Sequence, residues 1–254
     1  MRLDTDTEWE RWGQFDPYFG VITHPKFRRA ALDDEARKEF FESGERHVEY
    51  VLQVIRTHID AYFRPKSVLD FGCGVGRTLI PFSRVSDQVM GLDVSPSMLA
   101  EAASNCAAGR VTNVGLELSD DRLTRVRQHF DLVHSFIVFQ HLEPERGRRI
   151  FGELIRRVAP GGVGAVHVLY SKSHYAATLG VPTQTAALSQ NLNRLSPDPE
   201  MQMNAYGATE VMFTLQSLGV QRVHVDFSDH GGELGMFLFF LVPASAIPAP
   251  EWRP

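Results

Sequence analysis

The sequence of 254 residues contains only two cysteines, Cys73 and Cys106. Two cysteines give no disulfide framework and suit a reducing compartment. Long apolar runs are also missing, because the longest strongly apolar stretch, 236–242, is far too short to span a bilayer. The first residues lack the apolar core of a secretory signal. We therefore expect a cytoplasmic protein that does not associate with membranes.

Positive charge is scarce as well. The chain has 26 Lys and Arg against 31 Asp and Glu, a formal net charge of −5. A nucleic-acid-binding protein usually presents a basic face, so we expect no nucleic-acid partner. The local basic cluster of Arg146, Arg148 and Arg149 is interpreted as the solvated face of a helix. The acids Asp120, Asp121 and Asp131 do not form a convincing metal-ligand set, so no metal is expected. The oligomeric state is left open.

Apolar strand-like segments alternate with helical segments over most of the chain. Strands are expected at 67–71, 88–93, 115–118, 130–135 and 163–170, and helices at 33–56, from about 77, from 96, from 144 to about 158, and at 208–218. Repeated apolar strand–helix units predict an α/β fold with a doubly wound, mostly parallel sheet. Two last strands, 222–227 and 236–242, flank the turn at 229–232, which predicts a hairpin and an antiparallel last strand. We expect one domain over 1–254.

Two segments fall outside this alternation. Residues 1–30 are aromatic and polar, and the Asp16-Pro17 pair breaks any long helix there. Residues 171–205 are rich in Ser, Thr, Asn, Gln and Pro. We interpret the first segment as an N-terminal lid and the second as an insertion. Together they are predicted to form a pocket over the carboxyl edge of the sheet, where ligands bind in such folds.

Glycine recurs at every second position directly after the first strand, as Asp70-Phe71-Gly72-Cys73-Gly74-Val75-Gly76-Arg77. Such a turn is too tight for side chains and lets a ligand approach the backbone. About two dozen residues later the second strand ends in Asp93, the position from which an acid contacts a ribose in α/β folds. The alternatives are a tight turn without a ligand and a nicotinamide dehydrogenase, which prefers Gly-x-Gly-x-x-Gly spacing.

Four motifs in order resemble those of the class I methyltransferases that use S-adenosylmethionine. They are the glycine loop at 68–79, the segment at 91–99 after the second strand, the fourth strand at 130–135 with 139–142, and the turn at 157–162. The resemblance covers roughly residues 40–170 closely and the last two strands more loosely. It is specific for the superfamily, and it leaves the substrate open.

The resemblance implies a role for residues in each motif. The backbone of Gly72 and Gly74, with Gly76 completing the loop, meets the amino-acid half of the cofactor, and Asp70 supports its ammonium group. Asp93 accepts hydrogen bonds from the ribose hydroxyls, Val94 and Met98 flank the adenine, Asp120 or Asp121 reaches the adenine amine, and Ser135 and Phe136 lie beside the methionine part. Arg77 is a candidate contact for the cofactor carboxylate, with a surface role as the alternative.

The methyl acceptor is predicted to be a small molecule, with oxygen weakly favoured over nitrogen as the methylated atom. The sequence after the fourth strand, Ser135-Phe136-Ile137-Val138, lacks the Pro-Pro-aromatic tetrad of enzymes that methylate base amino groups. No Pro-Cys pair is present for cytosine-C5 chemistry. His141 is the candidate general base, because histidine accepts protons near neutral pH. The alternative is that His141 braces the following helix.

Aromatic residues of the lid are expected to contact the cofactor. Tyr18 is predicted to present its ring face to the sulfonium, a favourable cation–π contact, with simple packing as the alternative. His174 and Tyr175 are weaker candidates for acceptor contact, and His134 is interpreted as a packed core histidine. Two other functions stay open: a non-catalytic regulatory partner that binds S-adenosylmethionine and, less favoured, a nicotinamide-dependent oxidoreductase.

Overall fold

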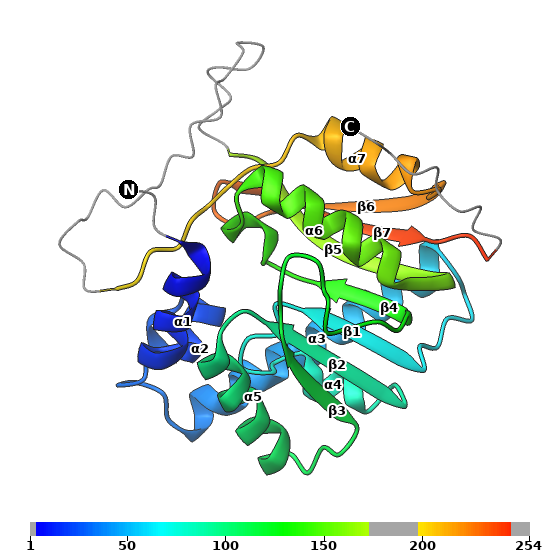
Figure 1. Ribbon diagram of the computed structural model, residues 1–254. Coiled ribbons are helices and arrows are strands. Elements are labelled where there is room, and N and C mark those ends of the chain that lie inside the picture. Colours follow the sequence, from blue (N-terminus) through cyan, green and yellow to red (C-terminus); the bar gives the residue numbers. More distant parts are fainter. Residues whose placement is uncertain (1–3, 173–197, 245–254) are drawn as a thin grey trace.

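The computed structural model describes residues 4–172 and 198–244, and these fold around one seven-stranded sheet (Figure 1). The strand order is β3-β2-β1-β4-β5-β7-β6. The strands are β1 (Ser67–Phe71), β2 (Gln88–Asp93), β3 (Val114–Leu118), β4 (Phe130–Ser135), β5 (Val158–Lys172), β6 (Arg222–Asp229) and β7 (Glu233–Leu241). The first five are parallel, whereas β7 runs antiparallel to both β5 and β6. The predicted mostly parallel sheet with an antiparallel C-terminal end is confirmed.

Helices cover both faces of the sheet, as expected for a doubly wound fold. The helices are α1 (Thr5–Phe15), α2 (Pro17–Val21), α3 (Asp34–His58), α4 (Leu79–Ser83), α5 (Pro96–Ala108), α6 (Pro144–Arg157) and α7 (Ala208–Ser217), with short 3₁₀ turns at Pro25–Phe27 and Phe139–His141. One apolar core joins α6 and α7 to the sheet, and a second joins α3, α4 and α5 to the opposite face. Within the described parts of the chain, no helix is both long and apolar enough to cross a membrane.

The strand that follows α6 begins earlier than expected. Its predicted start was Val163, but β5 begins at Val158, which pairs with Phe130 of β4. A register shift between Phe130 and Leu132 accommodates the Pro160-Gly161-Gly162 segment inside the strand. The cause is close packing, because a Cβ on Gly162 would lie 2.9 Å from the main-chain oxygen of Asp131. Val158 was expected on the apolar face of the helix and instead lies in the strand.

The N-terminal helices pack beside α5, at the carboxyl edge of β1 and β2 (Figure 1). The chain breaks between α1 and α2 at Asp16-Pro17, as the sequence predicted. A third apolar cluster holds these helices against α3, α5 and the glycine loop; its buried members are Trp12, Tyr18, Phe19, Phe27, Ala36, Phe40, Val75 and Met98. Of the predicted insertion at 171–205, residues 173–197 lie outside the described residues, and with them His174 and Tyr175.

Candidate functional site

A cavity of 610 Å³ opens at the carboxyl edge of the sheet. Its wall combines the glycine loop, the ends of β2 and β4, the turn between α2 and the following 3₁₀ segment, and the hairpin between β6 and β7. Met201 and Met203, from the described end of the predicted insertion, also line it. Such a volume lies in the ordinary range for small-molecule sites.

The glycine loop presents bare backbone to this cavity. Gly72 and Gly74 have φ angles of 74° and 51°, in a region of backbone conformation that residues other than glycine rarely adopt. A Cβ on Gly74 would lie 2.7 Å from Val21 Cγ2, and a Cβ on Gly72 would collide with Val138. Gly44 of α3 lies equally close to the main-chain carbonyl of Arg77, so a Cβ there would also collide. The loop is therefore closely packed against Val21, Val138 and helix α3, and only glycine fits at these positions, so no side chain of Gly72 or Gly74 covers the main chain.

Asp93 ends β2 at the wall of the cavity. One carboxylate oxygen accepts a hydrogen bond from the Gly74 N–H at 2.8 Å, and the other accepts from the Ser95 N–H at 2.9 Å. Burial raises the pKa of Asp93 to about 6, against the lowering effect of these hydrogen bonds. Each oxygen keeps acceptor capacity, so the carboxylate can bind a pair of hydroxyl groups. Ser95 also caps α5, accepting from the Met98 N–H at 3.0 Å.

A row of hydrogen-bonded side chains runs from the cavity wall to helix α3. The carboxylate of Asp70 accepts from the Thr78 hydroxyl at 2.6 Å and contacts His134 Nδ1 at 2.7 Å. His134 Nε2 in turn lies 2.9 Å from Nε2 of His47, which comes from α3. Since a carboxylate only accepts, His134 must carry a proton on Nδ1. His134 is buried as expected, but it also orients Asp70, and sequence reasoning missed its partner His47.

Arg77 lines the cavity on the other side of Asp70. Its Nη1 donates to the Ser43 hydroxyl at 3.3 Å, while its Nε is buried and has no hydrogen-bond partner in the described part of the chain. A buried N–H without a partner is costly, so this guanidinium is well suited to receive an anionic ligand group.

The structure gathers nine of the predicted site residues around the cavity and leaves five outside its wall. Those on the wall are Asp70, Gly72, Gly74, Arg77, Asp93, Val94, Met98, Phe136 and His141. Those outside are Tyr18, Gly76, Asp120, Asp121 and Ser135.

Each residue outside the wall has partners elsewhere. The Tyr18 hydroxyl donates to Glu101 at 2.7 Å and lies 2.9 Å from Asn105 Oδ1, so the side chain packs between α2 and α5. The Ser135 hydroxyl donates to the Phe71 carbonyl at 3.0 Å. Asp120 accepts from the Thr124 hydroxyl within its own loop, and Gly76 packs against Ala102.

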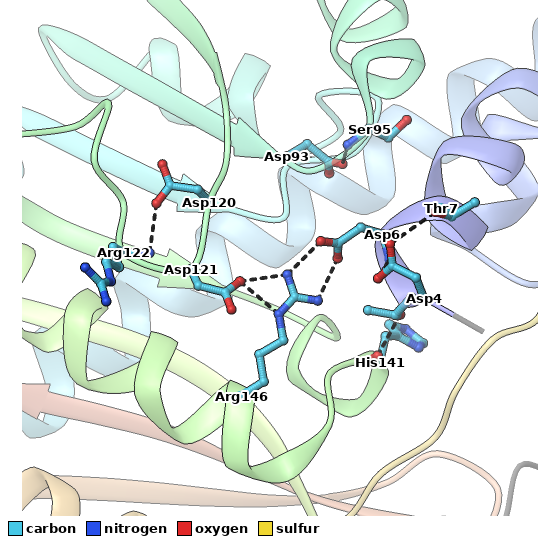
Figure 2. Close-up of polar contacts among 11 residues, drawn as sticks. Asp4, Asp6, Thr7, Asp93, Ser95, Asp120, Asp121, Arg122, His141 and Arg146 are labelled. Carbon is cyan, nitrogen blue, oxygen red and sulfur yellow. Dashed lines mark hydrogen bonds and ion pairs between the residues drawn. The ribbon is translucent and has the colours of Figure 1, made fainter. Parts of the chain in front are cut away.

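Asp121 belongs to a latch that joins three elements. Figure 2 shows Arg146 of α6 between Asp121, which follows β3, and Asp6 of α1. Arg146 Nε lies 2.8 Å from Asp121, and its Nη1 and Nη2 lie 2.8 and 2.7 Å from the two oxygens of Asp6. Hydrogen bonds to Asp6 and then Asp121 raise the pKa of Arg146. The expectation of a solvated Arg146 is therefore wrong, because only 19% of its side chain is exposed.

Helix α1 contacts both sides of the cavity mouth. Glu10 accepts from the Ser97 N–H at 3.1 Å and from the hydroxyls of Ser95 and Ser97 at 2.7 Å each. On the other side the Thr5 hydroxyl donates to the His141 carbonyl at 2.9 Å. Asp6 and Trp9 thereby become part of the wall, and sequence reasoning had not selected either. Their only sequence signal was membership of the predicted lid.

His141 lies on the cavity wall with its ring engaged. Its Nδ1 donates to the Gln202 carbonyl at 2.8 Å, and Trp9 packs edge-on at 4.7 Å between ring centroids. Burial lowers the pKa of His141 to about 4, so the ring is neutral at pH 7 and accepts protons weakly. The geometry suits a brace between the 3₁₀ turn Phe139–His141 and residue 202 more than a free base.

Residues 68–162 match the family model described as a methyltransferase domain. An uncharacterized methyltransferase of Synechocystis sp. is 29% identical over 110 residues, which cover 43% of this chain and 50% of that protein. A ubiquinone biosynthesis O-methyltransferase of Bradyrhizobium sp. is 31% identical over 107 residues, covering 40% and 39%. The match thus spans half or less of the length of these relatives.

The structural likeness extends over nearly all of the chain. Magnesium protoporphyrin IX methyltransferase of Synechocystis, crystallised with bound SAH, aligns with a TM-score of 0.63 and 16% identity, over 94% of this chain and 99% of that one. At such low identity the likeness shows the fold. Residues 68–162 are therefore similar to a methyltransferase domain, and the chain has the same fold as this solved methyltransferase.

Proposed function

We propose that the protein is an S-adenosylmethionine-dependent methyltransferase that acts on a small molecule, with oxygen favoured over nitrogen as the methylated atom. One observation carries the proposal. The buried carboxylate of Asp93 holds the N–H of Gly74, so the hydroxyl-binding acid and the bare glycine backbone face the same cavity. An acid for the ribose hydroxyls beside exposed backbone suits a nucleoside that carries an amino-acid group. Such a ligand has no phosphates, so it needs no basic phosphate-binding site.

The residues present fit this cofactor part by part. Asp93 would take the two ribose hydroxyls, and Val94 and Met98 would pack on the adenine. Asp70 would face the ammonium group and Arg77 the carboxylate, which would give the unpartnered Arg77 Nε an acceptor. Asp6 is placed closer to the cavity than the predicted Asp120 and Asp121, so it is a further candidate for the adenine amine.

The bound cofactor supplies an electrophilic methyl group on a sulfonium. The chain itself aligns the two substrates and excludes water, which are the main contributions a protein makes to such a displacement. Helix α1 serves the second task, because it is hydrogen-bonded to both sides of the cavity mouth. The catalytic role of His141 stays a prediction. Its pKa of about 4 makes it a weak base, which favours acceptors that lose their proton easily.

A small acceptor is supported by the shape and chemistry of the cavity. Its wall is largely apolar, with Trp9, Ile22, Phe136, Leu169 and Met203 among its members. The net charge of −5 gives no basic footprint for nucleic acid. The names of two similar proteins, a ubiquinone biosynthesis O-methyltransferase and a magnesium protoporphyrin IX methyltransferase, also refer to small molecules.

Calorimetry with S-adenosylmethionine and with NAD tests the cofactor. We expect binding of the first alone, and we expect Asp93→Ala to weaken it at least tenfold, the effect of one charge-assisted hydrogen bond. Asp87→Ala, an exposed acid just before the same strand, is the matched control and should leave affinity unchanged.

Turnover is tested separately with methyl-labelled cofactor and a panel of small metabolites. Labelled product establishes the transferase. Tight binding with no transfer to any acceptor would instead favour the regulatory partner, and binding of NAD in place of S-adenosylmethionine would overturn the proposal.

A further inference from the structure

The cavity reaches beyond the residues assigned to the cofactor. Those residues lie on β1, β2 and the glycine loop, and they extend to Phe136 after β4. The wall continues to Leu169 of β5, His230 of the hairpin turn and Glu233 of β7. In the sheet order, β5 and β7 are three and four strands from β2, roughly 14 and 19 Å at about 4.8 Å per strand. Among the described residues, this end of the cavity is lined by side chains to which no part of the cofactor has been assigned.

The far end contains a buried ion pair. Lys172 closes β5 and lies directly opposite Glu233 in the antiparallel ladder, with Nζ 3.4 Å from Glu233 Oε1. Only 1% of the Lys172 side chain is exposed, against 21% for Glu233. Glu233 is therefore the member that reaches the cavity, and Lys172 is the counter-charge behind it.

This pair is incompletely hydrogen-bonded. Within residues 4–172 and 198–244, Lys172 Nζ has no hydrogen-bond partner, and neither has the buried Oε2 of Glu233. Buried polar groups in folded proteins are nearly always paired, and those left unpaired call for an explanation. His167, whose ring packs near both Phe136 and His230, has an unpartnered Nδ1 as well. Two unsatisfied polar atoms thus belong to the ion pair itself, and a third lies further along β5, next to the wall residues Phe136 and His230.

Few ligand groups satisfy such a pair. Lys172 offers donors only, and the Glu233 carboxylate offers acceptors only. A cationic amine would be repelled by Lys172, and an anionic carboxylate would be repelled by Glu233. A hydroxyl is uncharged and can donate one hydrogen bond, so it can satisfy the Glu233 carboxylate without adding a charge beside the ion pair. The adjoining wall, with Phe136 and Leu169, is apolar.

We infer that Glu233, backed by Lys172, is the polar contact of the methyl acceptor, and that the acceptor is an apolar small molecule bearing an uncharged hydroxyl group. This inference rests on the proposed function, because it names the acceptor class of the same site. The hydroxyl donates to the Glu233 carboxylate, while the apolar body packs against Phe136 and Leu169.

The test uses four probes that share one ring: benzyl alcohol, benzyl methyl ether, benzylamine and benzoate. Their affinities are measured by ligand-observed NMR on the full chain saturated with S-adenosylhomocysteine. Benzyl alcohol should bind best, and the ether, which cannot donate, should bind about tenfold more weakly. Glu233→Gln keeps the shape but weakens the acceptor, so it should remove the preference for the alcohol.

Glu145→Gln is the matched control, because Glu145 is an exposed glutamate that is also ion-paired, with Arg149. It should leave all four affinities unchanged. Lys172→Met should also reduce alcohol binding, and if that variant fails to fold, Glu233→Gln decides alone. Tighter binding of benzylamine or benzoate, binding of none of the probes, or an undiminished preference for the alcohol over the ether in Glu233→Gln would overturn the inference. Loss of S-adenosylhomocysteine binding, measured in the same samples, would count against the proposed function instead.

Discussion

At the scale of single residues, Asp93 links the loop, the strand and the proposed ligand. Two main-chain N–H groups hold its carboxylate, and burial raises its pKa to about 6. The acid is therefore ionised at pH 7 and becomes protonated just below its pKa. A protonated acid loses acceptor capacity for hydroxyl donors, so the site should depend on pH in a range where the rest of the fold is unaffected.

The first prediction concerns this titration. The affinity for S-adenosylhomocysteine should be constant above about pH 7 and fall as the pH drops through 6, by up to about tenfold per pH unit, because only the ionised acid accepts both hydroxyls. Calorimetry between pH 5 and pH 8 measures it. Asp93→Asn should bind weakly with a flat profile, and a flat profile in the unsubstituted protein would refute the role of Asp93.

The second prediction separates a base from a brace at His141. His141→Asn removes the ring that holds the Gln202 carbonyl and packs on Trp9. We expect the free energy of unfolding to fall by about 1–3 kcal/mol, the cost of an unpaired buried group, with activity falling in parallel. Urea unfolding and turnover are compared on the same samples. A large loss of turnover at unchanged stability would establish His141 as a catalytic base.

At the scale of elements, the strands were predictable and the lid contacts were not. The ranges 67–71, 88–93 and 130–135 were predicted to the residue, because apolar strands between helices leave a local signature. The latch joins Asp6 to Arg146, 140 positions apart, through charges that look ordinary on any helix surface. Likewise, nothing near His47 marks it as the partner of His134, 87 positions away. Long-range pairs of this kind arise from tertiary packing alone.

The third prediction tests the latch. Arg146→Ala removes three hydrogen bonds between α6, α1 and the loop after β3, so α1 should open more often. We expect faster dissociation of S-adenosylhomocysteine, by threefold or more, and greater hydrogen exchange in α1. Stopped-flow fluorescence of the lid tryptophans follows the first quantity.

Arg149→Ala is the control, since Arg149 lies on the same helix and its ion-pair partner is Glu145, whose side chain is three-quarters exposed. Equal dissociation rates in both variants would show that the latch does not hold the lid.

The fourth prediction concerns the row of side chains that runs from the cavity wall to helix α3. His47→Phe leaves Nε2 of His134 buried without a partner, so the free energy of unfolding should fall by about 1–3 kcal/mol. His58→Phe, an exposed position near the end of the same helix, should cost little. Denaturant unfolding compares the two, and equal stabilities would argue that the contact with His134 contributes nothing.

At the scale of the whole molecule, one cavity is built from segments that span almost the entire described chain. The fold class could be predicted from local motifs, because glycine turns and strand-end acids are short-range signals. The same motifs supplied fourteen candidate site residues, of which nine lie on the cavity wall. The lid and the far end, with Asp6, Trp9 and Glu233, depend on how helices and the last hairpin close over the sheet. No single motif encodes that closure.

The fifth prediction concerns the stability of the whole chain. A ligand in a cavity lined by several helices and strands binds only the folded state and therefore stabilises it. S-adenosylhomocysteine at 100 times its dissociation constant should add about 2.7 kcal/mol to the stability. For a chain of this length, that corresponds to a rise in melting temperature of about 5–10 °C. Differential scanning fluorimetry measures it, and a shift with NAD of the same size would point to a different cofactor.

The tight contact between Gly44 and the carbonyl of Arg77 makes the ligand site vulnerable from a distance. Gly44 lies on the helix beneath the sheet and does not line the cavity. A single added methyl group there would collide with the main chain and the Cγ of Arg77, so it would displace the glycine loop and the proposed carboxylate contact although residue 44 itself does not line the cavity. The position of the glycine loop thus depends on a residue of helix α3 that lies behind the loop and carries no sequence motif of its own.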